Sequence, residues 1–172
     1  LVFKKGRDNF TGQDVAIITR YDVIGEPNNF KGIEGNYNGT KKVPSKALAV
    51  KLKKDSETYN VVVAHLISKR SNNDKKRAAQ ANAIVKHLDG KTGHNIVMGD
   101  LNDTPDSTTL NLLVQSGLNI INDKEYSYTY QNKKMLIDHI LVSDSLKTGA
   151  TFKSFDLGAI SDHRAVIADL KK

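Results

Sequence analysis

The sequence predicts a mixed α/β layered domain. Three observations lead to this prediction. Short apolar runs rich in β-branched residues recur along the 172 residues, as expected of buried strands. Two segments between these runs carry apolar residues at helical spacing. The strands nearest the two ends of the chain follow one another closely, as in hairpins, which argues against a simple parallel sheet.

Six short segments are apolar enough to form strands. The first three are residues 15–18, 47–52 and 59–64, and a polar turn at 53–58 joins the last two. The segment 28–42 is rich in Gly, Asn and Lys, so we expect a long surface loop there. The remaining strands are expected at residues 96–98, 140–142 and 165–167.

Two helices are expected, each with capping residues at its start and a glycine just beyond its end. The first follows the polar run 72–74 and stops before Gly90. The second opens at residues 106–107 and stops before Gly117. The residues expected to face inward are Ala78, Ala81, Ile84, Val85 and Leu88 in the first helix and Leu110, Leu113 and Val114 in the second.

The composition favours a polyanionic partner and excludes several classes of site. Lys and Arg together number 26 against 19 Asp and Glu, which gives a net charge of +7 and an isoelectric point near 9.5. Such a charge attracts nucleic acid. Because Cys is absent, disulfides, thiolate zinc sites and cysteine catalysis are excluded. No apolar stretch approaches the roughly 20 residues that span a bilayer, so we expect no membrane partner. Nothing indicates oligomerisation, so a monomer is expected.

Polar residues suited to metal-assisted phosphoryl chemistry stand at the ends of four predicted strands. They are His65, Asp100, Asn102, Asp138, Asp162 and His163. Carboxylates can hold Mg²⁺, an asparagine can orient a phosphate, and a histidine exchanges a proton near neutral pH. Asp100 and Asn102 would project the same way from an extended segment. Residues 103–106 have the composition of a turn and helix cap. The conjunction of the polar residues favours a phosphodiester-cleaving enzyme.

Four segments carry a resemblance to a known family. They are Val-Val-Val-Ala-His-Leu at 61–66, Ile-Val-Met-Gly-Asp-Leu-Asn at 96–102, Ile-Asp-His-Ile-Leu-Val-Ser at 137–143 and Ser-Asp-His-Arg-Ala-Val at 161–166. In order and separation they resemble the endonuclease/exonuclease/phosphatase superfamily, the group that includes deoxyribonuclease I. The resemblance implies the fold of that group, a layered α/β sandwich of two mixed sheets flanked by helices. The resemblance covers nearly the whole chain, so residues 1–172 are expected to form a single domain.

Further positions resemble secreted bacterial-type nucleases, and this closer likeness favours secretion. They are residues 6–8 (Gly-Arg-Asp), Arg77, Gln80 and residues 126–128 (Tyr-Ser-Tyr). The family domain begins with a strand-helix-strand portion that carries a metal-binding Glu, and the resemblance implies that the chain starts after that portion. Either upstream residues supply this Glu, or the chain is a reduced homologue with weak Mg²⁺ binding. The activity of the chain by itself depends on which case holds.

The resemblance also implies roles for the polar residues. Asp100 handles the attacking water or the leaving oxygen, and Asn102 orients the phosphate. His163 contacts the scissile phosphate while Asp138 holds its ring, and His65 is a second histidine near the leaving group. The implied metal ligands are Asp162, Asp100 and Asn102. The implied ion is Mg²⁺ or Mn²⁺, with Ca²⁺ as a further option.

The leading hypothesis is therefore a divalent-metal-dependent nuclease that hydrolyses DNA, with RNA as a second possible substrate. Arg70 and Tyr128 are the residues expected to contact the nucleic acid. His139 occupies a position where the family often has Tyr, and we expect it to be structural. Two alternatives stay open. One is a phosphoesterase of the same fold acting on a small or lipid phosphate, and the other is a non-catalytic homologue that binds polyanions.

Overall fold

A six-stranded mixed sheet forms the centre of the molecule, in the strand order β3-β6-β7-β8-β12-β9. The computed structural model describes residues 2–5, 14–70, 72–121 and 124–171, so the Gly-Arg-Asp segment at 6–8 lies outside the described residues. β7 and β8 are parallel, and the other neighbours are antiparallel. The α/β fold with a mixed sheet is thereby confirmed. The strands are β3 (Asp22–Asn28), β6 (Ala47–Lys54), β7 (Glu57–Ala64), β8 (His94–Asp100), β9 (Leu118–Ile120) and β12 (Asp138–Ser143).

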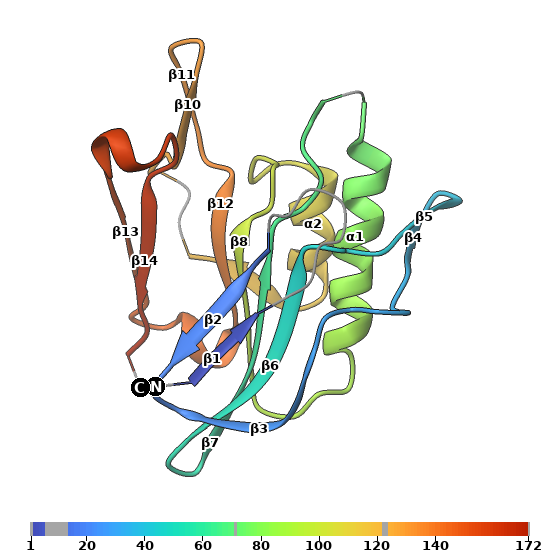
Figure 1. The fold of residues 1–172 in the computed structure, drawn as a ribbon, viewed down its shortest axis with the longest axis vertical. Coiled ribbons are helices and arrows are strands. Elements are labelled where there is room, and N and C mark those ends of the chain that lie inside the picture. The colour runs from blue at the N-terminus through green and yellow to red at the C-terminus, as the bar shows by residue number, and fades with distance from the viewer. Residues whose placement is uncertain (1, 6–13, 71, 122–123, 172) are drawn as a thin grey trace.

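The central strands are buried on both faces because their side chains alternate between two apolar layers. Val62, Val97 and Leu141 point to one face, where they pack against α1 (Asp74–Leu88) and α2 (Thr108–Gln115). Figure 1 shows both helices on the same side of the sheet. No helix among the described residues is both long and apolar enough to cross a bilayer.

The opposite face of the sheet is covered by two separate antiparallel pairs. One pair is β1 (Val2–Lys5) with β2 (Ala16–Thr19), and the other is β13 (Thr151–Phe155) with β14 (Ala165–Asp169). In the part of the chain that the structure describes, these pairs do not join into one sheet, so the expected second mixed sheet is not formed. The pairs pack over different strands, β2 over β6 and β7 and β14 over β12, which keeps them apart.

The segment 28–42, expected to be a surface loop, contains a short hairpin that packs on α1. Its strands are β4 (Gly35–Tyr37) and β5 (Thr40–Lys42). The loop prediction was wrong because a few apolar residues outweigh the polar composition, and Phe30 is completely buried. Gly35 permits the close contact, since a β-carbon there would collide with the carbonyl oxygen of Ala79.

The two helices have nearly the predicted bounds but differ in detail. Asn73 takes the N-cap position of α1, yet its side chain donates to the carbonyls of the preceding loop, not to the helix. Ser107 caps α2 as expected, because its hydroxyl accepts from the Leu110 amide. Val114, expected to face inward, is 41% exposed. The inward face of α2 is narrower than predicted and consists of Thr109, Leu110 and Leu113.

Candidate active site

Three polar segments far apart in the chain meet at one end of the central sheet. Asp100 ends β8 and Asp138 begins β12, and the antiparallel register pairs these two residues directly. His163 precedes β14 and forms an isolated antiparallel bridge with Tyr128. Ligand atoms of Asp100, Asp138 and His163 all lie within 4.8 Å of one another, so these three residues can hold a metal ion.

Gly99 explains why a glycine precedes the first carboxylate. Its φ angle is +126°, a conformation that L residues rarely adopt, and a β-carbon there would collide with the backbone of Ala64 on β7. The glycine therefore allows β8 to lie close to β7 immediately before Asp100, at the end of the sheet.

Asn102 reaches Asp100 by a turn and not along an extended strand, which corrects the expectation above. Its φ angle is +54°. Its backbone amide donates to Asp100 Oδ1 at 2.9 Å, and its side-chain amide donates to Asp100 Oδ2 at 3.2 Å and to the Leu66 carbonyl at 2.9 Å. The asparagine thus fixes the orientation of the carboxylate.

The Asp138–His163 pair has the geometry of a carboxylate that orients an imidazole. His163 Nδ1 lies 2.8 Å from Asp138 Oδ2. Burial lowers the pKa of His163, but the hydrogen bond and charge of Asp138, with the charges of Asp100 and Asp162, outweigh it and leave this pKa raised. A raised pKa increases the fraction of His163 that is cationic near neutral pH.

A buried serine, whose role the sequence did not reveal, locks the pair in place. Ser127 Oγ accepts hydrogen bonds from the backbone amides of Ile137 and Asp138 at 3.0 and 2.9 Å. The Ser127 carbonyl accepts from the amide of Arg164 at 2.7 Å. One residue therefore holds the segments on which Asp138 and His163 lie.

Asp100 carries the most perturbed carboxyl group of the cluster. Burial, followed by the negative charge of Asp138, raises its pKa to about 6, although the Asn102 amide and His163 act in the opposite direction. His65 Nε2 lies 3.5 Å from Asp100 Oδ2. Burial and the neighbouring carboxylates therefore both favour the protonated form of Asp100.

Replacing Asp100 with asparagine is expected to stabilise the metal-free protein at pH 7 by about 1–3 kcal/mol. The folded-state pKa of Asp100 lies above its ordinary value of 3.8, so the free energy of unfolding falls as the pH rises from about 4 to about 6 and then stays at the lower level as far as this group is concerned. Urea unfolding in a chelator at pH 4 and pH 7 measures the effect. The variant should gain stability over the wild type only at the higher pH, and a loss at pH 7 would contradict the inferred cost of ionising Asp100.

The other predicted residues lie at different distances from the cluster. The ring of Tyr128 packs on His163, with centroids 4.6 Å apart and planes at 34°. Asp162 is exposed and acts on Asp100 and His163 through its charge, but it is not among the three residues grouped above. Arg70 is exposed on the loop before α1, and the structure describes no contact between it and the cluster.

A buried ion-pair network supports the loop after Asp100. Asp103, expected in a turn, is 5% exposed and accepts from Arg77 Nε at 3.0 Å and from Lys69 Nζ at 2.9 Å. Burial raises the pKa of Asp103, but the hydrogen bonds from Lys69, Thr109 and Arg77 outweigh it and leave the pKa lowered. The Asp103 carbonyl also lies 2.8 Å from Nε2 of the buried His139, which fits a structural histidine.

The signal for this network was present in the sequence. Arg77 and Gln80 lie on the same helical face as Ala81 and Ile84, so two polar side chains had to be buried with the apolar ones. Gln80 is satisfied by the backbone amide of Ile67 and by a further carbonyl.

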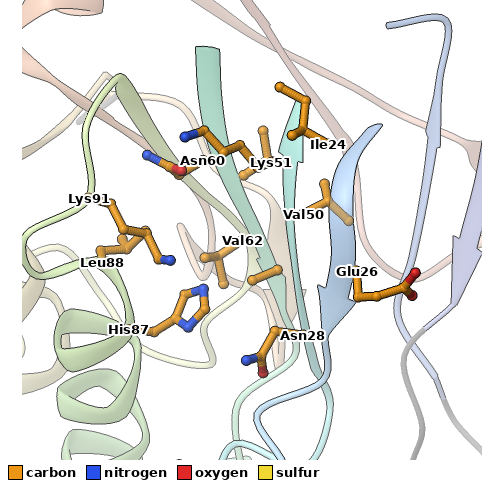
Figure 2. A pocket seen from close by; sticks show the side chains of 12 residues that line it. Ile24, Glu26, Asn28, Val50, Lys51, Asn60, Val62, His87, Leu88 and Lys91 are labelled. Atoms are coloured by element: carbon orange, nitrogen blue, oxygen red, sulfur yellow. The ribbon is translucent and has the colours of Figure 1, made fainter. Parts of the chain in front are cut away.

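A separate cavity of about 250 Å³ lies between the sheet and the end of α1. Figure 2 shows His87 and Leu88 facing Val62 and Asn28 across it, while the side chain of Glu26 points away. Burial, assisted by the charge of Lys91, lowers the pKa of His87 to about 4, so this ring is neutral at pH 7. None of the residues that line this cavity belongs to the cluster of Asp100, Asp138 and His163. The lining does not bring two carboxylates and a histidine together as that cluster does.

A model of the Endonuclease/Exonuclease/phosphatase family matches residues 3–163. The chain belongs to this family. Its members are typically metal-dependent phosphoesterases, and the cluster of Asp100, Asp138 and His163 lies within the matched region. A comparison with curated proteins found no match.

Solved structures of the endonuclease/exonuclease/phosphatase family share the fold. A family protein from Leptotrichia buccalis aligns with a TM-score of 0.70 at 13% identity, over 99% of this chain and 71% of that one. TDP2 of D. rerio, complexed with single strand DNA product, aligns with a TM-score of 0.70 at 15% identity, over 96% of this chain and 74% of that one. The catalytic domain of human Nocturnin, with bound sulfate anion, aligns with a TM-score of 0.62 at 18% identity, over 88% of this chain and 60% of that one. The chain thus spans 60% of the Nocturnin domain.

Proposed function

We propose that the protein is a divalent-metal-dependent phosphodiesterase that hydrolyses nucleic acid, with DNA as the first substrate to test. The observation that carries this proposal is the Asp138–His163 pair, 2.8 Å apart, beside the perturbed carboxyl group of Asp100. A phosphate diester needs positive charge on its non-bridging oxygens, a base for water and an acid for the leaving oxygen. The cluster offers positive charge in His163 and a base in Asp100.

The residues of the site fit a divalent cation. Burial and like charge raise the pKa of Asp100, and a cation nearby would relieve both effects. We propose that Asp100 holds the ion together with Asn102 and Asp162, because Mg²⁺ prefers oxygen ligands and keeps several waters. In this proposal Asp138 and His163 keep their hydrogen bond to each other and do not bind the ion. When bound, the ion would stabilise the negative charge that develops on the phosphate.

The protein's own side chains take the remaining roles. His163, held by Asp138, places positive charge at the phosphate oxygens and donates a hydrogen bond from the nitrogen that Asp138 leaves free. Asp100 accepts the proton of the attacking water. We propose His65, whose Nε2 lies 3.5 Å from Asp100 Oδ2, as a second histidine near the leaving group.

Nucleic acid is favoured as the substrate by charge and by the aromatic residue at the site. The net charge of +7 attracts a polyanion, and the Tyr128 ring beside His163 gives a base a surface for stacking. The D. rerio TDP2 structure, of the same fold, contains single strand DNA product. We propose that the protein acts as a monomer and that Arg70 contacts the phosphate backbone from its exposed loop.

Cleavage of a substrate panel tests the proposal. Plasmid DNA, a single-stranded oligonucleotide, RNA, a phosphomonoester and a phosphocholine lipid are incubated with Mg²⁺, Mn²⁺, Ca²⁺ or a chelator. We expect nucleic acid cleavage that requires the metal and disappears with the chelator. A protein with both Asp100→Asn and His163→Ala, purified in parallel, controls for contaminating nuclease. Turnover confined to the monoester or the lipid would contradict the nuclease proposal, and binding without cleavage would favour a non-catalytic homologue.

A further inference from the structure

Three aromatic rings form a stack that leads from the surface into the candidate active site. β10 (Tyr128–Tyr130) and β11 (Lys133–Met135) pair as a hairpin. The rings of Tyr130 and Tyr128 are nearly parallel, at 12°, with centroids 6.5 Å apart, and the Tyr128 ring in turn packs on His163. Residues two apart on a strand lie on the same face, so the hairpin itself aligns the two tyrosines.

The outer end of the stack is open to solvent. Tyr130 is 54% exposed, whereas the His163 side chain is 28% exposed. Figure 1 shows the β10–β11 hairpin projecting from the end of the molecule, beyond the strands of the central sheet. A large aromatic side chain held in a fixed orientation at such a place offers one face to a planar ligand.

Positive charge accompanies the stack. Lys133 and Lys134 are exposed on β11, the strand that pairs with the tyrosine strand. Lys133 pairs with Tyr130 and therefore lies on the face of the two tyrosines. Lys134 pairs with Thr129, on the other face, and its Nζ atom lies 4.4 Å from the centroid of the Tyr126 ring. Aromatic faces beside cations are the combination that binds single-stranded nucleic acid without sequence preference.

We propose that Tyr130, the exposed outer ring of the stack, stacks on an unpaired base next to the scissile phosphate, and that the enzyme therefore prefers single-stranded nucleic acid to duplex. The inference rests on the proposed function and names its substrate class. In a duplex the faces of a base are covered by its neighbours, and exposing one costs a few kcal/mol. In a single strand the faces are accessible, and a fixed ring can bind them at little cost.

A lipid surface would use the hairpin differently. Insertion into a bilayer interface favours a broad apolar face, whereas this hairpin presents two tyrosines with nearly parallel planes, one of them against His163, and an exposed lysine, Lys133, opposite Tyr130. Parallel planes that end at the candidate active site fit a row of bases better than acyl chains.

Tyr130→Ala tests the proposal because Tyr130 touches neither Asp100 nor His163 in the described contacts. The measured quantity is kcat/KM on a single-stranded oligonucleotide, on the same strand in a duplex, and on bis(p-nitrophenyl) phosphate. We expect wild type to prefer the single strand. In Tyr130→Ala the ratio of single-strand to small-diester activity should fall about tenfold or more, mainly through KM. Tyr130→Phe, which keeps the ring, should restore most of that loss.

Tyr21→Ala is the matched control, since Tyr21 is an exposed tyrosine outside the hairpin and should keep the wild-type ratio. Equal wild-type activity on both strand forms, or an unchanged ratio in Tyr130→Ala, would overturn the inference. If no nucleic acid is cleaved, the proposed function fails, but fluorescence anisotropy in a chelator still tests the stack by comparing single-stranded with duplex DNA. Tyr130-dependent binding to anionic vesicles without Tyr130-dependent binding to DNA would assign the hairpin to lipid instead.

Discussion

Replacing His163 with alanine is expected to lower kcat for phosphodiester hydrolysis by about 10²- to 10⁴-fold, with a much smaller change in KM. The substitution removes a side chain whose pKa is raised, and which therefore brings positive charge to a site rich in carboxylates. That charge matters more as negative charge develops on the phosphate than it does in the ground state, so the effect falls on kcat. Steady-state kinetics at saturating Mg²⁺ on one oligonucleotide, for the variant and the wild type, measures it.

Asp138→Asn distinguishes this role from simple loss of structure. The asparagine keeps the shape of Asp138 but removes the charge that raises the pKa of His163, so that pKa should fall. If the protonated ring is the active form, activity declines as the pH rises through this pKa, and in Asp138→Asn the decline should move to lower pH. Titration of the His163 ring by NMR checks the shift independently. Activity within threefold of wild type in His163→Ala would place the chemistry elsewhere.

The end of the sheet could be predicted from the sequence because its signals are local. An apolar run followed by Gly99 and Asp100 indicates a buried strand that ends where its backbone comes close to a neighbouring strand. The structure shows this strand end at Asp100 and the close approach at Gly99. The pairing of Asp138 with His163 followed from the family resemblance. The number of residues between Asp138 and His163 could not predict this pairing. It depends on the bridge between Tyr128 and His163, and the distance between two segments along the chain does not determine which of their residues pair.

The parts that could not be predicted depend on tertiary contacts. Residues 28–42 look like a loop by composition, and only the surface of α1 makes a hairpin of them. Asp103 has the sequence context of a turn residue, and its burial could not be predicted because it depends on the hydrogen bond from Arg77, 26 residues earlier in the chain. The prediction of a second mixed sheet was wrong for a similar reason. A pair of strands can be recognised locally in the sequence, whereas the joining of two pairs into one sheet depends on where each pair packs.

The buried pair of Arg77 and Asp103 leads to the largest expected effect on stability. Arg77→Met is expected to lower the free energy of unfolding by about 3–5 kcal/mol. The Arg77 side chain is fully buried and contacts both Asp74 and Asp103. Methionine fills similar space but leaves Asp103, 5% exposed, without its main buried cation. Urea denaturation at pH 7 gives the difference.

Two controls separate the ion pair from general damage to α1. Arg70→Met changes an exposed arginine just before the same helix and should alter stability by less than about 0.5 kcal/mol. Arg77→Met combined with Asp103→Asn should recover part of the loss, since no buried charge then remains unpaired. A loss below about 1 kcal/mol in Arg77→Met would contradict a dominant role for the pair.

The pH dependence of stability gives an independent check on the same pair. The folded-state pKa of Asp103 lies below its ordinary value, so its contribution is present above pH 4 and is lost as the pH falls through the folded pKa. Without Arg77 this pKa should rise, and the acid-induced loss of stability should begin at higher pH. Since Asp103 follows Asn102 and holds His139, we expect the weakened loop to lower activity as well, even at temperatures where Arg77→Met remains folded.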